Sequence, residues 1–163
     1  MSTSKERVLA REKERGYVVG HEEAQYIQTN ADSMTGTELY MVDFKIPSFT
    51  AALNKMNMMD RPAGQTGGFV CRSSAGRVVR LLQNYDSTVY LHEDGTPWEP
   101  EELPAQWGFK WSTDPAKALP FVAISTSPYM TGDCCTVDGV AYRSLMDNNV
   151  WNPVDYPSGW EEA

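Results

Sequence analysis

The sequence predicts a mainly β protein with a helical N-terminal arm, in which two tandem small antiparallel β units are related by an internal repeat. We expect the arm at residues 1–35, the first unit at 36–120 with an inserted loop at about 84–97, and the second unit at 121–163. Three observations lead to this prediction: an aromatic motif that occurs twice, a hairpin-like stretch before each copy of the motif, and a charged segment ahead of both.

The aromatic motif has the spacing W-x-P-x-x-[LY]-P-x-x-W and accounts for four of the 5 tryptophans. Its first copy runs from Trp98 to Trp107, and its second copy runs from Trp151 to Trp160. A β unit of about 40 residues is near the size limit at which its own core is sufficient. The two units are therefore expected to pack against each other or against a partner.

The N-terminal arm is predicted to hold two short helices. Thr3 and Glu6 fit a capping box, which predicts a highly charged helix over 4–15. A second helix is predicted over 21–31. Its apolar stripe would consist of Ala24, Ile27 and Ala31. These helices carry too little apolar surface to fold alone, so the arm either docks on another subunit or is a solvated terminus.

The first unit is predicted to begin with a strand over 37–49, because apolar residues alternate there until Pro47 ends the pattern. A short helix is expected at 51–59. Two hairpin strands follow at 69–72 and 77–83, because each combines apolar residues with flanking turn residues.

The remaining elements follow from turn and capping residues. A third strand is predicted at 108–112, and Asp114 is the N-cap of a single helical turn that closes the first unit. The second unit is predicted to form a hairpin around Asp138 and Gly139 and to end in a strand after Trp160.

The charge balance argues against nucleic acid as a partner. The formal net charge is -8 at pH 7 and the sequence pI is about 4.7, whereas phosphates are usually bound by clustered Lys and Arg. No apolar run reaches the length of a signal peptide or of a membrane span, so no membrane partner is predicted. We expect a soluble product that is made in a cytoplasm.

The cysteines, Cys71, Cys134 and Cys135, are interpreted as buried thiols in apolar strands. Successive side chains of a strand point to opposite faces, so at most one of Cys134 and Cys135 can share a core with Cys71. There is no C-x-x-C pair, and a structural zinc ion requires four N or S ligands. The sequence therefore predicts no metal site and no cofactor.

The four motif tryptophans are predicted to have two different roles. Trp107 and Trp160 each follow a turn and would fill the core, whereas Trp98 and Trp151 lie beside proline-braced polar segments and would be partly exposed. An exposed indole suits a sugar, because its flat face covers axial C–H groups while nearby polar side chains bind hydroxyls. The polar side chains expected to do so beside Trp151 are Asn148 and Asn149. The alternative, that all four tryptophans are core residues, stays open at this point.

The last third of the chain carries four short motifs in order. They are Tyr129-Met-Thr-Gly-Asp133, Asp138-Gly-Val-Ala-Tyr-Arg143, Trp151-Asn-Pro153 and Pro157-Ser-Gly-Trp160. This segment resembles the small carbohydrate-binding modules appended to bacterial chitinases, whose pattern is Y-x-x-G-D, G-x-x-Y, W-x-P and P-x-x-W. It also resembles the C-terminal segments of many phage and prophage tail proteins.

The resemblance implies that Trp151 is the exposed sugar platform, that Tyr129 and Tyr142 support it, and that Trp160 is buried. By the internal repeat, Trp98 would be the corresponding residue of the first unit. The resemblance also implies a place in a phage virion, at the tail, baseplate or capsid surface. The expected partners are other virion subunits, further copies of the chain in a homo-oligomer, and a host cell-wall or surface polysaccharide.

The sequence offers no set of catalytic residues. Glu101-Glu102 and Glu161-Glu162 are adjacent carboxylates at turns, interpreted as solvated charge, and not an acid and a base that face each other across a substrate. We therefore expect a non-enzymatic virion accessory protein that binds host-surface glycans through exposed tryptophans. The alternative is a purely structural virion assembly protein that uses the same β units to pack on neighbouring subunits.

Overall fold

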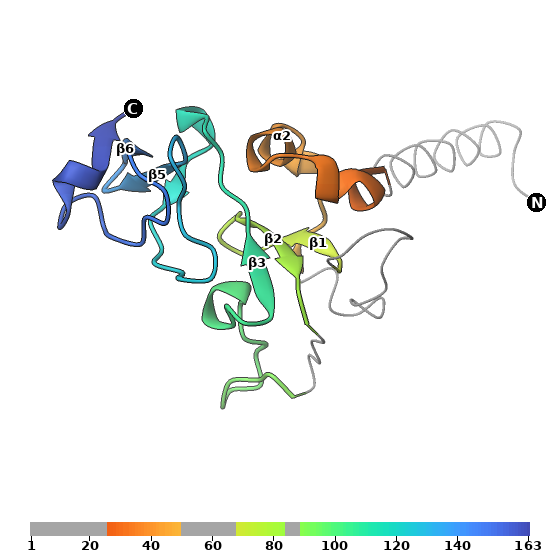
Figure 1. Cartoon of the computed structure of the whole chain (residues 1–163). Coiled ribbons are helices and arrows are strands. Elements are labelled where there is room, and N and C mark those ends of the chain that lie inside the picture. Colours follow the sequence, from red (N-terminus) through yellow and green to blue (C-terminus); the bar gives the residue numbers. More distant parts are fainter. Residues whose placement is uncertain (1–25, 50–67, 84–88) are drawn as a thin grey trace, which may run out of the picture.

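The computed structural model describes residues 26–49, 68–83 and 89–163, which form two β sheets beside a small helical region (Figure 1). The first sheet consists of β1 (Val70–Arg72), β2 (Val78–Leu81) and β3 (Trp107–Phe109), in that order. The second sheet consists of β4 (Leu119–Pro120), β5 (Cys134–Val137), β6 (Val140–Ser144) and β7 (Trp160–Glu162), again in that order. The predicted class, mainly β with a helical N-terminal region, is confirmed.

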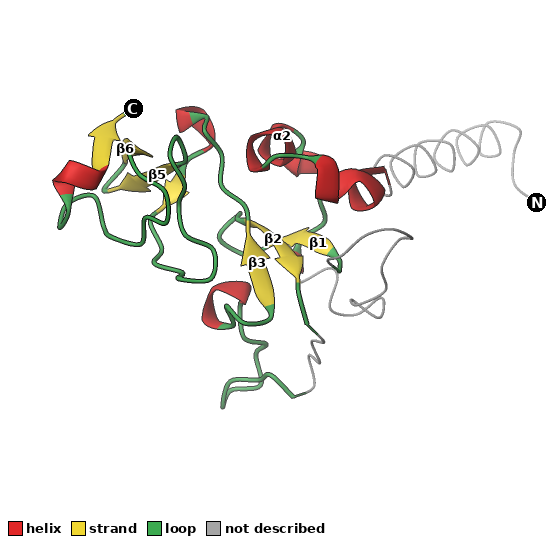
Figure 2. Cartoon of the chain, viewed as in Figure 1, coloured by secondary structure: helices red, strands yellow, loops and turns green. Residues whose placement is uncertain are grey.

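The helical elements are short, and loops join them to the strands (Figure 2). Residues 26–30 are helical, which confirms the described part of the helix predicted over 21–31. The other elements are α2 (Gly36–Met41) and the 3-10 turns η1 (Ala31–Ser33), η2 (Asp43–Lys45), η3 (Pro100–Glu102), η4 (Pro115–Lys117) and η5 (Pro157–Gly159). The helices predicted over 4–15 and 51–59, with the capping box at Thr3, lie outside the described residues.

The strand predicted over 37–49 is wrong, because α2 and η2 occupy this segment. The helix begins with a capping box in which the Thr35 side chain accepts from the Glu38 amide and the Glu38 side chain accepts from the Thr35 amide. The adjacent residues Leu39 and Tyr40 are both buried, whereas Met41 and Phe44 are exposed. The alternation of apolar residues therefore did not reflect alternating burial.

Both sheets are built around a hairpin followed by a strand that starts at a motif tryptophan. The β1–β2 and β5–β6 hairpins are antiparallel, and β3 and β7 pair antiparallel with β2 and β6. The turns use left-handed residues, with φ of 88° at Gly76, 51° at Asp138 and 79° at Gly139. The predicted hairpins are confirmed, with bounds that differ by one or two residues.

The sequence predicts an antiparallel second unit. This is wrong for one pair of strands in the second sheet, because β4 pairs with β5 in parallel. A crossover through residues 121–133, instead of a tight turn, separates these two strands and brings β5 back in the same direction. A similar parallel bridge joins Ser48 to Arg72 at the edge of the first sheet.

The two sheets share one hydrophobic core. Its buried residues are Phe49, Cys71, Val79, Leu81, Trp107, Phe109, Trp111, Ile124, Tyr129, Cys135 and Trp160. Trp111 stacks on Tyr129 with 4.2 Å between ring centroids and 19° between ring planes, and so connects the end of the first sheet to the crossover of the second. The expectation that the two parts of the chain pack on each other is met within the chain itself.

The helical region covers the opposite face of the first sheet. A second cluster of buried residues consists of Ile27, Ala31, Leu39, Tyr40, Ile46, Val70 and Val78. The amide of Gln28 also donates to the carbonyl of Val70 at 2.7 Å and accepts from its N–H at 2.8 Å. This side chain thus satisfies the edge of β1 as a neighbouring strand would.

The cysteines are free and buried. Cys71 and Cys135 both lie in the shared core, whereas Cys134 points away from it, as the strand geometry predicted. Burial raises the pKa of the Cys71 thiol and raises the pKa of Cys135 to about 12. These thiols are therefore protonated at neutral pH and are poor nucleophiles.

The substitution Gly36→Ala is expected to destabilise the fold even though alanine is the better helix former. A Cβ atom at this position would lie 2.1 Å from the carbonyl oxygen of Trp111. The required shift is expected to cost about 1–3 kcal/mol, more than the roughly 1 kcal/mol that helix propensity would return. Urea unfolding followed by circular dichroism measures the free-energy change.

Met41→Ala is the control, because Met41 is in the same helix and its side chain is exposed. Its stability is expected to stay within about 0.5 kcal/mol of the wild type. An equally stable Gly36→Ala protein would show that α2 does not lie this close to Trp111.

Candidate functional site

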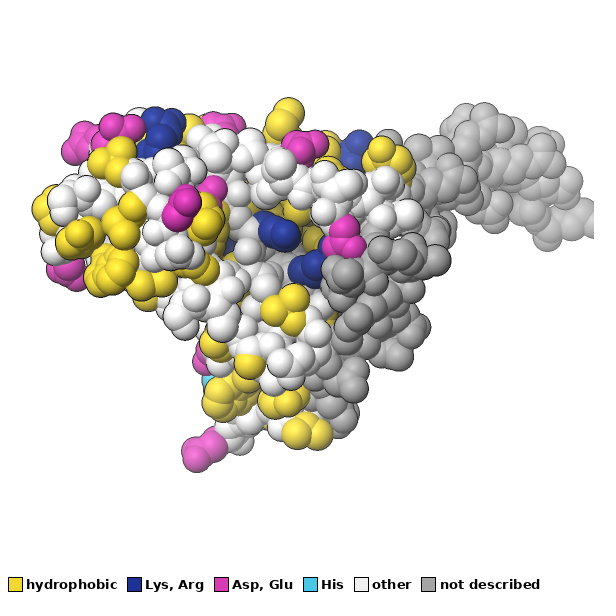
Figure 3. Space-filling view, in the orientation of Figure 1, with side chains coloured by type: hydrophobic (Ala, Val, Ile, Leu, Met, Phe, Trp, Pro, Cys, Tyr) yellow, Lys and Arg dark blue, Asp and Glu magenta, His cyan; other side chains and the backbone are white. Residues whose placement is uncertain are grey.

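The four motif tryptophans divide into a buried pair and an exposed pair. Trp107 and Trp160 are 0% and 4% exposed, whereas Trp98 and Trp151 are 36% and 48% exposed. The expected division of the tryptophans is therefore confirmed, and the alternative that all four are core residues is wrong. Figure 3 shows hydrophobic side chains gathered on the end of the molecule that carries the second sheet.

The buried side chain of Asn149 holds the Trp151 loop in place. The side-chain amide of Asn149 donates to Ser144 Oγ and to the Gly159 carbonyl, each at 3.0 Å, and its Oδ1 accepts from the Trp151 N–H at 3.2 Å. The indole N–H of Trp160 donates to the Trp151 carbonyl at 2.8 Å. Both backbone polar groups of Trp151 are thus held by side chains that are themselves buried.

Tyr156 lies beside Trp151 and extends its apolar surface. The ring centroids are 5.6 Å apart, the planes are tilted by 42°, and Tyr156 is 42% exposed. Gly159 permits this position, because a Cβ atom there would lie 2.8 Å from the Tyr156 ring. Sequence reasoning placed Tyr156 in the motif but missed it as a surface residue. The available signal was its position between Pro153 and Pro157, which brace the same loop.

The other predicted site residues are not equally accessible. Tyr129 and Asn149 are buried, and their backbones pair in both directions at 3.0 and 2.8 Å. Tyr142 is partly buried against the core, and Asn148 is exposed with φ of 55°. The expected hydroxyl contact by Asn149 is therefore corrected: the side chain is too deep to meet a ligand, and it positions Trp151 instead. Tyr129 likewise lies beneath the surface, in a supporting place.

Trp98 stands in a different environment. The ring of His92 stacks on it, with 5.1 Å between centroids and 19° between planes. His92 Nε2 lies 2.9 Å from Glu102 Oε2, which also accepts from the Glu99 N–H at 2.8 Å. The Trp98 and Trp151 side chains thus share a motif position but not the same surroundings.

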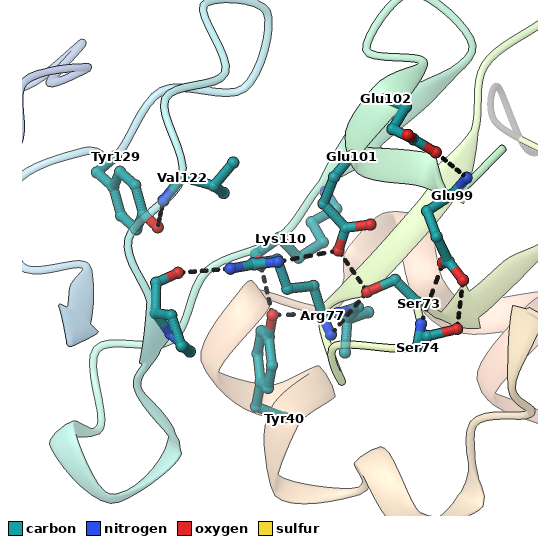
Figure 4. A network of polar contacts seen from close by, with 12 residues as sticks. Tyr40, Ser73, Ser74, Arg77, Glu99, Glu101, Glu102, Lys110, Val122 and Tyr129 are labelled. Carbon is teal, nitrogen blue, oxygen red and sulfur yellow. Dashed lines mark hydrogen bonds and ion pairs between the residues drawn. The ribbon is translucent and has the colours of Figure 1, made fainter. Parts of the chain in front are cut away.

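Glu101 and Glu102, interpreted from the sequence as solvated charge, are both engaged in contacts. Glu101 Oε1 accepts from Arg77 Nη1 at 3.0 Å and from Ser73 Oγ at 2.5 Å, and Arg77 Nη2 donates to the Pro120 carbonyl at 2.6 Å (Figure 4). Arg77 is buried. This network joins the β1–β2 turn, η3 and β4, which is a structural role. The interpretation as solvated charge is therefore wrong for Glu101, whose side chain is largely buried.

The segment that carries Trp151 is strongly acidic. Residues 121–163 contain six carboxylates and one cation, Arg143, a net charge of -5. Arg143 itself lies 3.8 Å from Glu161. Burial raises the pKa of Asp133, and hydrogen bonds from Thr131 lower the pKa of Asp147. Trp151 and Tyr156 are therefore exposed rings on a segment whose net charge is negative.

Within 26–49, 68–83 and 89–163, no group of three His, Cys, Asp or Glu side chains could hold a metal ion. The described helices are all too short or too polar to cross a membrane. A shallow pocket lies between η2 and η4. The ion pair of Lys117 and Asp43, with 3.3 Å between Nζ and Oδ1, forms part of its lining.

Asn149→Ala is expected to lower stability by about 2–3 kcal/mol, because it leaves buried partners of three hydrogen bonds unsatisfied. Thermal unfolding measures this loss, and hydrogen exchange at the Trp151 amide should accelerate. The control is Asn148→Gly at the neighbouring exposed position, where φ of 55° suits glycine and the change should be under about 1 kcal/mol. Equal stability of the two variants would contradict the assigned role of Asn149.

Comparison with known proteins identifies no relative of the chain. No protein-family model, curated protein or solved structure matches the chain. What the exposed tryptophans do must therefore be inferred from their own geometry and surroundings.

Proposed function

We propose that the chain is a non-enzymatic accessory protein of a phage virion, at the tail, baseplate or capsid surface, that binds host-surface glycans. The observation that carries the binding activity is the exposed pair Trp151 and Tyr156 on a loop fixed by Asn149. A rigid, partly exposed aromatic surface suits the apolar face of a sugar ring, because little conformational entropy is lost on binding. The place in a virion rests on the resemblance of residues 129–160 to phage tail segments.

We further propose that the chain consists of two copies of one ancestral unit, predicted at 36–120 and 121–163, although β4 at the end of the first range pairs in the second sheet. Corresponding backbone hydrogen bonds support this. Leu82 N donates to the Gln106 carbonyl at 2.7 Å, just before the first buried tryptophan. Leu145 N donates to the Gly159 carbonyl at 2.9 Å, just before the second. The same strand register is thus used beside each motif.

The packing of the buried tryptophans supports the repeat independently. Phe49 meets Trp107 edge to face, with centroids 5.7 Å apart at 85°. Phe121 meets Trp160 at 6.2 Å and 90°. Each phenylalanine lies at the corresponding place, immediately after the short segment that pairs in parallel with the first hairpin strand. Arg80 and Arg143 also occupy matching positions in β2 and β6.

A single aromatic platform binds weakly. Covering roughly 50 Å² of apolar surface contributes about 1 kcal/mol at 25 cal/mol per Å². Tyr156 adds a comparable surface, and exposed Asn148 is placed to meet hydroxyls. Useful retention on a cell wall therefore requires many copies, which an oligomer within a particle would provide through effective concentration.

The acidic surroundings narrow the ligand to uncharged glycans. An anionic polymer that meets Trp151 approaches a segment, residues 121–163, with six carboxylates and one cation, which is paired with Glu161. At separations of about 10 Å in 0.1 M salt, several such charges together oppose binding by about as much as one platform contributes. A neutral polysaccharide meets no such opposition.

The alternative function, a purely structural assembly protein, is favoured by exposed apolar side chains elsewhere on the molecule. Tyr26, Met41 and Phe44 are all exposed on the helical side of the molecule. Contact of these side chains with a neighbouring subunit would not exclude glycan binding by Trp151, because they and Trp151 lie on different elements. If the folded wild type binds no glycan in the experiments below, assembly is the function that remains.

Trp151→Ala and Tyr156→Ala are each expected to weaken binding to neutral polysaccharide about fivefold, because each removes one ring of the platform. The measurement is affinity electrophoresis of the full chain against cellulose derivatives, chitin, starch and dextran, with host-type cell walls as a separate panel.

Phe44→Ala is the matched control, since it removes an even more exposed ring in η2, far from the Trp151 loop in sequence. Its binding should equal that of the wild type. A folded wild type that binds none of these glycans, even when displayed in many copies, would overturn the proposed activity.

The charge of the ligand is expected to matter in a defined direction. Alginate and hyaluronate should bind more weakly than the neutral glycans, and raising NaCl from about 0.05 to 0.5 M should reduce this difference by screening the carboxylates. Binding of the neutral glycans should change by less than about twofold over the same range. Tighter binding of the anionic polymers at low salt would contradict the selectivity proposed here.

A further inference from the structure

The loop inserted before the first motif copy folds back onto that copy's own tryptophan. Trp98 N donates to the Tyr90 carbonyl at 3.1 Å, and His92 N donates to the Thr96 carbonyl at 2.8 Å. The turn between them is closed by Gly95, with φ of 85°, and by Asp94, which accepts from the Thr96 N–H at 3.0 Å. This small hairpin brings His92 and Trp98 to the same side.

His92 lies on Trp98 as a flat ligand would. The two rings are nearly parallel, at 19° and 5.1 Å between centroids. A sugar cannot stack on this face of the indole while the imidazole lies there. In contrast, Tyr156 is tilted by 42° and stands beside Trp151, so that it widens the platform instead of covering it.

His92 is held in this place from a second direction. Its Nε2 lies 2.9 Å from Glu102 Oε2 in η3. The Glu102 carboxylate is itself fixed by the Glu99 N–H, in the capping box of the same 3-10 turn. The imidazole is therefore positioned between the indole and an anchored carboxylate, with two restraints against leaving the ring.

The second motif copy has no matching insertion. About ten residues of the first copy, between Leu82 and Trp98, have no counterpart between Leu145 and Trp151. The residue that covers Trp98 belongs to this extra segment. The two copies thus differ in whether the exposed tryptophan is covered. They agree in the buried tryptophan and in the register of the strand that it begins.

We propose that the first platform is capped by the protein itself: His92 occupies the sugar-binding face of Trp98, so each chain offers one open platform, at Trp151. This inference rests on the proposed glycan-binding function. It assigns His92 as the residue that sets the number of sites per chain, and it predicts that removal of the imidazole creates a second site for the same class of neutral glycan.

The test uses variants of the full chain in which the Trp151 platform is removed. The probe is whichever neutral polysaccharide the wild type binds best in the panel above. Trp151→Ala alone should show only the residual binding that Tyr156 supports. The double variant Trp151→Ala/His92→Ala should bind about fivefold more tightly than Trp151→Ala, the gain expected from one uncovered indole face. Adding Trp98→Ala should remove that gain.

A conservative variant separates uncovering from a general loosening of the loop. Trp151→Ala/His92→Phe keeps a flat ring on Trp98 but loses the Glu102 contact, so it should stay closed. Circular dichroism and thermal unfolding verify that each variant is folded, which is expected because His92 is at the surface.

The outcomes distinguish this inference from the function on which it rests. Trp98-dependent binding by Trp151→Ala alone, or no gain from His92→Ala in a folded protein, would overturn the cap while leaving glycan binding at Trp151 intact. Absence of binding by the wild type would overturn both. Restoration by His92→Ala that Trp98→Ala abolishes is the result that supports it.

Discussion

The stacking of Trp111 on Tyr129 is the contact on which the rest of the structure depends, because neither sheet is large enough to bury a core alone. Phe109 stacks on Trp111 from one side and Phe121 stacks on Tyr129 from the other, so one column of rings passes from the first sheet into the second. The same Tyr129 pairs through its backbone with Asn149, whose side chain fixes Trp151. The exposed platform is therefore only two contacts away from the shared core, which explains how a loop with little regular structure can present a rigid surface.

Arg77 supplies the polar counterpart of that aromatic column. Its guanidinium is buried and bonds to Glu101 in η3 and to the Pro120 carbonyl in β4, so that three separate segments meet at one cation. A buried ion pair of this kind adds little net stability, since desolvation offsets its attraction, but an incorrect arrangement would leave a charge unpaired. The pair thus selects one relative placement of the motif turn and the linker. Glu102 belongs to the same turn, η3, and contacts His92. The position of η3 therefore also determines where the loop that covers Trp98 lies.

The parts of this structure that the sequence predicts are those controlled by local chemistry. Left-handed residues at Gly76 and Gly139 specify the hairpins, and the position of Trp107 and Trp160 after a turn indicates that they are buried. The third strand, predicted at 108–112, begins at Trp107 and ends at Phe109. The segment at 36–45 was predicted incorrectly, because the capping box at Thr35 and the fit of α2 against Trp111 outweigh the alternating apolar pattern. The roles of Asn149 and Tyr156 depend on which side of a loop faces the core, and no pattern in a single sequence reports that. The stacking of His92 on Trp98 depends on a hairpin whose pairing only the coordinates reveal.

A self-capped platform is consistent with weak binding by each chain if attachment is governed by the number of chains. One open platform contributes about 1 kcal/mol, so a monomer would be released quickly and only an array would be retained. In an array, a second site on each chain adds less to the overall affinity than a second chain does. Effective concentration depends on how the sites are spaced across the target, and two sites on one small molecule are close together. The first motif copy can then lose its ligand without loss of attachment, provided that its fold still supplies the other half of the shared core. Its buried half, Trp107 against Phe49, is retained with the geometry of Trp160 against Phe121, whereas its exposed half is covered. Under the proposed function, packing therefore constrains both copies, and glycan binding constrains only the second.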